Sequence, residues 1–211
     1  MALRNVIIKG DPLLRRQSRE IKEITDRIRL LADDMWETMY DANGVGLAAP
    51  QVGVLRRLIV IDVTEPPEEE GEGGEGTPAA EGKQEADVAA ETEGNPEPEE
   101  RPEQEPEGIP TSEERPEPEI IKYALVNPVI LEVSEETETT KEGCLSVPGQ
   151  VGFVERAVRV KVGAKDLDGK YFEIEGEGML ARALLHEIDH LDGVLFTDIA
   201  ETVEDLENAS E

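Results

Sequence analysis

Two stretches of the chain carry apolar residues at the spacing of an α-helix, one near each end. In the first stretch they recur every three or four positions, at Ile28, Leu31, Met35 and Met39. Thr25 precedes it as a candidate N-cap, and Asn43-Gly44 follows it as a candidate left-handed C-cap. The second stretch runs from Met179 to about Leu191, and Gly193 is expected to end it. The pattern therefore predicts two helices.

Between and beside these helices, short apolar or alternating runs predict strands and extended segments. They cover residues 6–8, 58–63, 123–131, 133–141, 158–162 and 171–175. Asp168-Gly169 supplies a tight turn between the last two runs. We expect a final strand or turn at residues 194–199 and an acidic tail, loose or weakly helical, at residues 200–211. The predicted fold is α+β: mostly antiparallel β-sheets packed around a central C-terminal helix, with the N-terminal helix outside.

One long stretch breaks this pattern. Residues 65–119 contain 21 acidic residues against three basic ones, ten of the 14 prolines, and no aromatic residue. Their net charge of −18 is most of the −29 of the whole chain. Such a segment buries too little apolar surface to offset the entropy lost on ordering it. We therefore expect a single domain over residues 1–211, interrupted by a disordered insertion at 65–119; a second small domain is the alternative.

Charge and composition argue against several kinds of partner. A net charge of −29 and a pI near 4.3 disfavour direct binding to nucleic acid or to an anionic membrane, because both require basic patches. No apolar run reaches the roughly 18 residues of a membrane span, and the first residues lack a secretion signal. The single cysteine, Cys144, suits a reducing compartment. We expect a cytoplasmic protein.

Candidate chemistry is concentrated on the second predicted helix. His186 and His190 are the only two histidines of the chain, and their spacing of four places both imidazoles on one helical face. Two such ligands suit a tetrahedral metal ion, with Glu187 beside them as a base for water. Two solvated or capping histidines are the alternative. The spacing together with the glutamate favours a metal site.

Cys144 is the candidate third ligand. It lies just after a predicted strand, and the preceding Gly143 permits a close approach to a ligand. A thiolate with two imidazoles binds divalent iron or zinc and leaves one position for water. Asp189 and Asp192 are too near the histidines along the helix to converge with them. A lone cysteine is usually a buried apolar side chain, so this interpretation depends on the two histidines.

A glycine-rich run is the third unusual stretch. Gly44 to Gly53 is small, apolar and almost uncharged, with Gln51 as its one polar side chain. Its glycines and alanines would let a ligand or another backbone approach closely. Taken alone, a buried strand with an exposed glutamine explains this run equally well.

Three blocks together resemble the signature motifs of peptide deformylase, in that family's order. They are Gly44-Val45-Gly46-Leu47-Ala48-Ala49-Pro50-Gln51, Glu142-Gly143-Cys144-Leu145-Ser146 and His186-Glu187-Ile188-Asp189-His190. Apart from the acidic insertion, the resemblance covers nearly the whole chain. It implies a bacterial or organellar enzyme that removes the formyl group from the N-terminal formyl-methionine of new proteins.

The resemblance also implies roles in the reaction. The metal would be most often Fe²⁺ in the cell, with Zn²⁺, Ni²⁺ or Co²⁺ as substitutes, and its ligands would be Cys144, His186 and His190. Glu187 would act as general base towards water and then protonate the departing amine. The side-chain amide of Gln51 and the backbone N–H of Leu145 would stabilise the oxyanion together with the metal.

The implied substrate is an N-formyl-Met nascent peptide in the bacterial cytoplasm. Its backbone would pair with Gly46 as an extended strand, and its methionine side chain would lie near Val45 and Ala183. A transient encounter with the ribosome is expected, without direct binding to nucleic acid and without a membrane. The insertion and the short acidic tail depart from the family pattern, so a ribosome contact through a C-terminal helix is not carried over.

Two other functions fit part of the sequence. An HExxH-type metallopeptidase cutting internal peptide bonds would need a further metal ligand after His190. The only candidate ligands in that part of the sequence are acidic residues. A catalytically inactive acidic protein with a structural metal would usually fill all four metal positions with cysteine or histidine. The chain has three such residues in total, which leaves a position for water.

Overall fold

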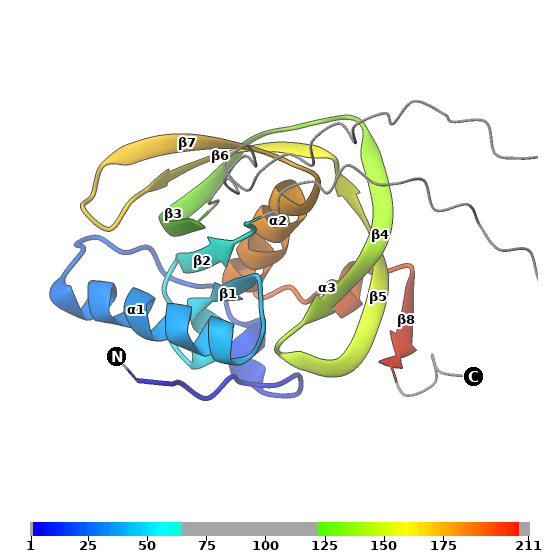
Figure 1. The fold of residues 1–211 in the computed structure, drawn as a ribbon, viewed down its shortest axis with the longest axis horizontal. Helices are drawn as coiled ribbons and strands as arrows, with labels where there is room; N and C mark the ends of the chain where they lie inside the picture. Colours follow the sequence, from blue (N-terminus) through cyan, green and yellow to red (C-terminus); the bar gives the residue numbers. More distant parts are fainter. Residues whose placement is uncertain (1, 65–121, 207–211) are drawn as a thin grey trace, which may run out of the picture. The chain divides into compact units, whose positions relative to one another are not determined.

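The structure is a computed structural model that describes residues 2–64 and 122–206 (Figure 1). Its helical elements are η1 (Pro12–Arg15), α1 (Asp26–Asp41), η2 (Ala49–Val52), α2 (Gly178–Asp192) and α3 (Phe196–Ile199). Its strands are β1 (Gly46–Ala48), β2 (Leu58–Asp62), β3 (Lys122–Val133), β4 (Thr137–Cys144), β5 (Val147–Ala157), β6 (Arg159–Lys165), β7 (Tyr171–Glu177) and β8 (Thr202–Asp205).

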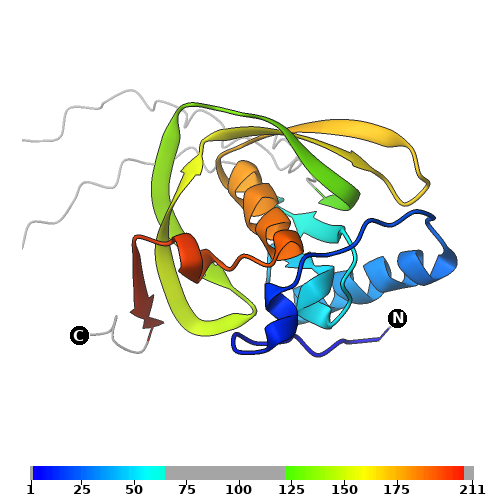
Figure 2. The same cartoon turned by 180° about the vertical axis from the view of Figure 1, so that it is seen from behind.

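The strands form two antiparallel sheets. One has the order β1-β2-β3-β6-β7 and the other the order β4-β5-β8. Helix α2 contacts β1, β2, β6 and β7 of the first sheet and β5 of the second, and Figure 2 shows it running between them. Helix α1 contacts β1 and β2. The prediction of antiparallel sheets with few helices is confirmed.

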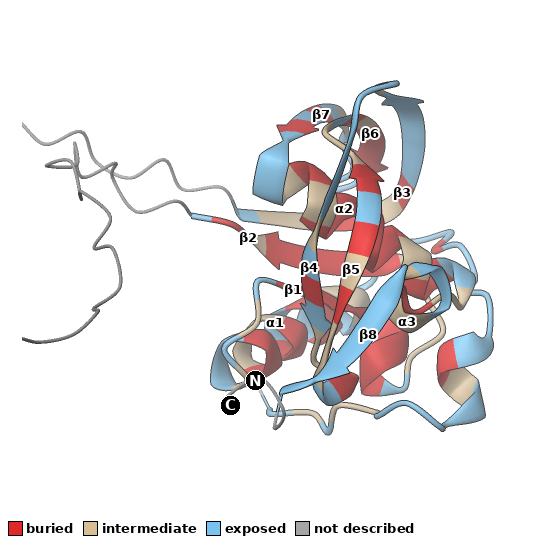
Figure 3. Ribbon diagram, turned by 90° about the vertical axis from the view of Figure 1, so that its right-hand side faces the viewer, coloured by how far each residue is buried: buried red, intermediate tan, exposed pale blue. Residues whose placement is uncertain are grey.

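Strand β2 lies between the two helices, which explains its unbroken apolar sequence. Ile59 and Ile61 belong to the cluster that includes α2, whereas Leu58 and Val60 belong to the cluster that includes α1. Figure 3 accordingly shows β2 buried along nearly its whole length. Because successive side chains of a strand alternate between faces, both faces must be apolar here. The strand fixes the two helices on opposite sides of the sheet.

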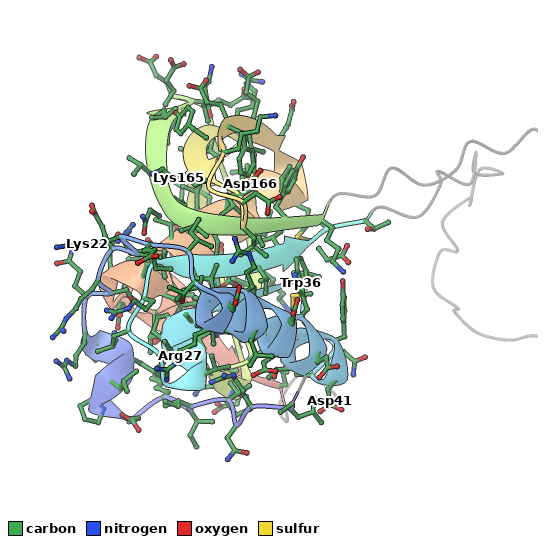
Figure 4. All side chains as sticks on the ribbon, turned by 90° about the vertical axis from the view of Figure 1, so that its left-hand side faces the viewer. Lys22, Arg27, Trp36, Asp41, Lys165 and Asp166 are labelled. Carbon is green, nitrogen blue, oxygen red and sulfur yellow. The ribbon has the colours of Figure 1, made fainter. Side chains whose placement is uncertain are left out.

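The ends of the helices follow the local sequence signals. Asn43 adopts a φ of 53° after α1, and Gly193 adopts a φ of 79° after α2, as predicted for left-handed caps. Thr25 occupies the N-cap position of α1, but its side chain makes no capping hydrogen bond. Trp36 (Figure 4) packs against the cluster beside α1, stacked on Tyr40, with the Lys122 ammonium 4.3 Å from the centre of its ring.

Three expectations about strands were wrong. Residues 194–199 were expected to form a final strand or turn, whereas Phe196–Ile199 form the short helix α3. Strand β5 was not predicted, because Pro148, Gly149 and Gly152 interrupt its apolar alternation. Residues 202–205 were expected to be loose or weakly helical, whereas they form β8 and pair with β5, from Gln150↔Asp205 to Phe153↔Thr202. Figure 3 shows β8 as an exposed outer strand. An exposed strand has no apolar face, and its partner is distant in sequence, so no local pattern predicts it.

Some expectations lie partly or wholly outside the described residues. The disordered insertion at 65–119 is one of them, and the end of the acidic tail is another. Among residues 2–64 and 122–206, no helix combines the length and the apolar character needed to cross a bilayer.

Gly193 is a position where the fold should tolerate no side chain. A Cβ there would lie 2.7 Å from the backbone carbonyl of Arg15, in addition to the strain of the positive φ. Gly149 has a similar φ of 76° but open space around it, which makes Gly149→Ala the matched control. We expect the control to lose about 1–2 kcal/mol of unfolding free energy and Gly193→Ala to lose about 1–3 kcal/mol more. Urea denaturation measures both; equal losses would contradict the packing described.

Candidate active site

The two histidines and the cysteine meet at one point between the sheets. His186 and His190 lie one turn apart on the same face of α2, and Cys144 ends β4 opposite them. The Cys144 Sγ lies 3.2 Å from His190 Nε2, and one ligand atom from each of the three residues lies within 4.8 Å of the others. Ligand atoms around a tetrahedral metal are about 3.3–3.6 Å apart. The donor set suits one divalent ion, and the distance between Cys144 and His190 is close to this spacing.

Glu142 fixes the orientation of the first imidazole. Its carboxylate, 5% exposed, lies 3.0 Å from His186 Nδ1 and accepts hydrogen bonds of 2.9 and 3.1 Å from Arg156. Burial would raise the pKa of Glu142, but the bonds from His186 and Arg156 outweigh it and lower the pKa to about 2. With Nδ1 held by this carboxylate, Nε2 is the nitrogen left for a metal. Burial acts to lower the pKa of His186, but the hydrogen bonds with Cys144 and Glu142 outweigh it and raise that pKa to about 10, so a metal binding at His186 would displace a proton.

The second imidazole is held differently. Burial lowers the pKa of His190 well below its usual value, so this ring is neutral. Its Nδ1 is buried and has no hydrogen-bond partner among the described residues. Arg156 also reaches Asp189, at 2.6 Å, and so connects β5 to the helix that carries both histidines.

Glu187 is buried beside the cluster. It is 4% exposed, and its Oε2 has no hydrogen-bond partner among the described residues. Burial raises its pKa to about 7; Glu142 and Asp189 add to the rise, while His186 opposes it. Gly46 of β1 covers this carboxylate so closely that a Cβ at residue 46 would lie 2.5 Å from Glu187 Oε1. The Glu187 carboxylate can therefore occupy this position only because residue 46 has no side chain.

The side-chain amide of Gln51 points towards Cys144. Its Oε1 accepts a hydrogen bond of 2.7 Å from the Ala48 N–H, which orients Nε2 towards Ser146 Oγ at 3.2 Å and Cys144 Sγ at 3.5 Å. Leu145 follows Cys144 in the turn between β4 and β5. The glycine-rich run is thus no plain buried strand, because it continues as β1 into η2 and brings Gln51, 1% exposed, to the cluster.

A cavity of about 650 Å³ opens onto these groups. Its walls come from the glycine-rich run, from β4 and the start of β5, and from the first turns of α2. All the sequence-predicted site residues except His190 line it: Val45, Gly46, Gln51, Cys144, Leu145, Ala183, His186 and Glu187. His190 lies behind them, 1% exposed. The structure therefore brings together every candidate residue taken from the sequence.

Sequence reasoning missed the polar groups behind the cluster. Glu142 was quoted as part of a motif without a role, and Ser146 likewise. Arg156 carried no signal in the sequence. Arg182 was not singled out, although it donates to Glu142 at 2.8 Å and to the backbone carbonyls of Val154 and Glu138. Arg182 stands four residues before His186, on the same face of the helix, which is the one local sign that could have identified it.

The fold and this arrangement of side chains define the class of metal-dependent hydrolases. Residues 3–205 match the family model described as polypeptide deformylase. The chain belongs to the peptide deformylase family.

Individual relatives agree along nearly the whole chain. The peptide deformylase of Lachnoclostridium phytofermentans is 44% identical over 198 residues, covering 94% of this chain and 89% of the relative. The crystal structure of peptide deformylase from Ehrlichia chaffeensis superposes with a TM-score of 0.67 at 32% identity, over 95% of this chain and 89% of that one. A Met-Ala-Ser bound crystal structure of peptide deformylase from Acinetobacter baumannii superposes with a TM-score of 0.66 at 30% identity, over 94% of this chain and 98% of that one.

Replacing Gly46 with alanine tests the packing on Glu187. The added Cβ has no room unless the carboxylate moves, so we expect deformylase activity to fall by about 10- to 100-fold. The three atoms nearest to this Cβ all belong to Glu187, so metal content measured by elemental analysis should stay the same. Activity within two-fold of the unchanged enzyme, in a folded variant, would contradict the close approach of Gly46 to Glu187.

Proposed function

We propose that this enzyme removes the formyl group from the N-terminal formyl-methionine of newly synthesised proteins and releases formate. One observation carries the proposal: a half-buried thiol and two buried imidazoles converge beside a buried carboxylate at a cavity of about 650 Å³. Membership of the deformylase family supports the same reaction. It also disfavours a metallopeptidase that cuts internal peptide bonds.

The proposed metal ligands are Cys144 Sγ, His186 Nε2 and His190 Nε2. A divalent ion bound there supplies Lewis acidity, which makes water a nucleophile near neutral pH. Fe²⁺ is the proposed native ion, with Zn²⁺, Ni²⁺ or Co²⁺ able to replace it, because thiolate and imidazole bind all four. Glu142 contributes by holding His186 in the tautomer that presents Nε2, and Arg156 and Arg182 keep Glu142 in place.

Glu187 is the proposed general base and acid. A carboxyl whose pKa is raised to about 7 accepts a proton from water and returns it to the departing amine with little cost in either direction at neutral pH. Its Oε2, which has no hydrogen-bond partner within residues 2–64 and 122–206, provides a site for that proton. The contact with Gly46 keeps the carboxylate from swinging away from the cluster.

The Gln51 Nε2 and the Leu145 N–H are the proposed donors to the oxyanion. Gln51 is suited to this because Ala48 fixes its amide, so that Nε2 faces the cluster before any substrate arrives. Leu145 is suited by its place directly after the proposed ligand Cys144. A donor that needs no reorganisation in the transition state contributes most to the rate.

The peptide is proposed to bind as an added strand along β1. Strand β1 is the outermost strand of its sheet, so one edge of Gly46 pairs with β2 and the other edge faces the cavity. Val45 and Ala183 line that cavity and are proposed to contact the methionine side chain. The Met-Ala-Ser bound relative supports a peptide in this site. A nascent chain near a ribosome in the bacterial cytoplasm is the proposed setting.

Residues 65–119 are proposed to be an insertion that the domain does not need. The strands on either side of it are neighbours in the first sheet, and the last pair of their register is Asp62↔Lys122. The chain therefore leaves and re-enters the domain at adjacent positions. A short turn is enough to join such ends.

Formate release tests the proposed reaction. Protein loaded anaerobically with Fe²⁺, or with Ni²⁺, should hydrolyse formyl-Met-Ala-Ser and leave acetyl-Met-Ala-Ser intact. Glu187→Ala should keep its metal and lose activity by about 100-fold or more, because the variant lacks the proposed general base. No formate from metal-replete protein would refute the proposal.

Deleting residues 65–119 tests the proposed domain organisation. Residues 63, 64, 120 and 121 remain to close the connection between Asp62 and Lys122. We expect the deletion variant to unfold in one cooperative transition and to keep kcat/KM for short formyl-Met peptides within about two-fold. A broadened or missing thermal transition would show that the segment is part of the folded domain.

A further inference from the structure

The beginning of the chain runs past the active site as an extended segment. Residues 2–9, called the N-terminal strap here, belong to neither sheet and pass from α1 towards the tip of the β4–β5 hairpin (Figure 1). The Ile7 N–H donates to the Gln51 carbonyl at 2.7 Å, and the Lys9 N–H donates to the Ser146 carbonyl at 2.6 Å. In an extended chain the N–H groups of residues two apart point the same way, so one edge of the strap makes both bonds.

The two acceptors lie next to strands of different sheets. Gln51 lies in η2, directly after β1 of the five-stranded sheet, and Ser146 lies between β4 and β5 of the three-stranded sheet. The proposed oxyanion donors lie on the same two pieces of chain, as the Gln51 side chain and the Leu145 N–H. Residues two apart in an extended chain are separated by about 6.6–6.8 Å. The strap thus sets the distance between the two pieces that carry the donors.

The strap is itself held in place. The Arg4 N–H donates to Thr38 Oγ1 at 3.0 Å, and the Arg4 guanidinium forms an ion pair of 2.8 Å with Asp34. The Ala2 N–H reaches the same carboxylate at 2.8 Å. Towards the other end, the Ile7 side chain packs against the apolar cluster that includes Val147 of β5. Anchoring on both sides makes the strap a fixed spacer rather than a loose end.

A direct bond supports the same geometry. Gln51 Nε2 donates to Ser146 Oγ at 3.2 Å, so these two residues are joined once through their side chains and once through the strap. We propose that the N-terminal strap is a positioning element for the reaction, which holds Gln51 and the Leu145-Ser146 turn at the separation that oxyanion stabilisation requires. This inference rests on the proposed deformylase function.

Proline substitutions remove the two bonds one at a time. Ile7→Pro and Lys9→Pro each delete one N–H, and an extended segment accepts the φ of proline. We expect kcat to fall by about ten-fold or more in each variant, because misplaced donors stabilise the transition state less. KM and metal content should change by less than two-fold, since the strap does not line the cavity. A role in stability alone would lower the melting temperature without this separation of kcat from KM.

Ile8→Pro is the matched control. It introduces the same ring between the two positions, and the Ile8 N–H has no acceptor among the described residues. Its kcat should stay within two-fold, and Ile7→Val, which keeps the N–H, should also remain active. The proposal is overturned if Ile7→Pro and Lys9→Pro keep kcat within two-fold, or if Ile8→Pro lowers kcat as much as they do.

A measurement on the unchanged enzyme covers the case in which the proline variants do not fold. Hydrogen exchange should show the amides of Ile7 and Lys9 protected and that of Ile8 exchanging faster. Unprotected amides at both positions would overturn the proposal without any variant. If the unchanged enzyme releases no formate, the proposed reaction fails instead; if it is active and the strap variants are equally active, only the strap inference fails.

Discussion

The buried carboxylate of Glu142 is the interaction on which the rest of the site depends. It comes from β4 and is bonded by Arg156 of β5 and by Arg182 and His186 of α2. Removing one partner of such a buried ionic group typically costs about 3–5 kcal/mol, because the others are left charged and unpaired. The same bonds that join the three-stranded sheet to the helix also orient His186, a proposed metal ligand. Stability and chemistry therefore share these four side chains.

The opposite wall of the site follows a different principle. The five-stranded sheet meets α2 through apolar packing, and at Gly46 the backbone comes close enough to confine Glu187. The wall formed by the three-stranded sheet thus positions His186 through charged hydrogen bonds. The wall formed by the five-stranded sheet positions Glu187 by close packing. Both walls of the site require α2 at one fixed position between the sheets. Strand β2 is apolar on both faces, and it fixes this position by packing one face against the cluster that includes α2 and the other against the cluster that includes α1.

Much of the site could be predicted from the sequence, because its members stand in short motifs. The spacing of His186 and His190 indicated a metal site and made Cys144 the candidate third ligand, and the resemblance to a family added roles for Leu145 and Gln51. Groups that act across long sequence distances could not be predicted. Arg156 shows no periodic pattern, and β8 and the strap bonds depend on partners far away in the chain. Local patterns carry information about helices and turns, whereas these contacts exist only in the folded state.

The pairing of Asp62 with Lys122 has a consequence for how the gene can change. Strands that are bonded neighbours can be joined by segments of different length. On the proposed domain organisation, we therefore expect additions and losses of codons at this junction to leave the active site unaltered. Differences in length between relatives should gather at this one point, while the spacing from Glu142 to His190 stays under strict selection.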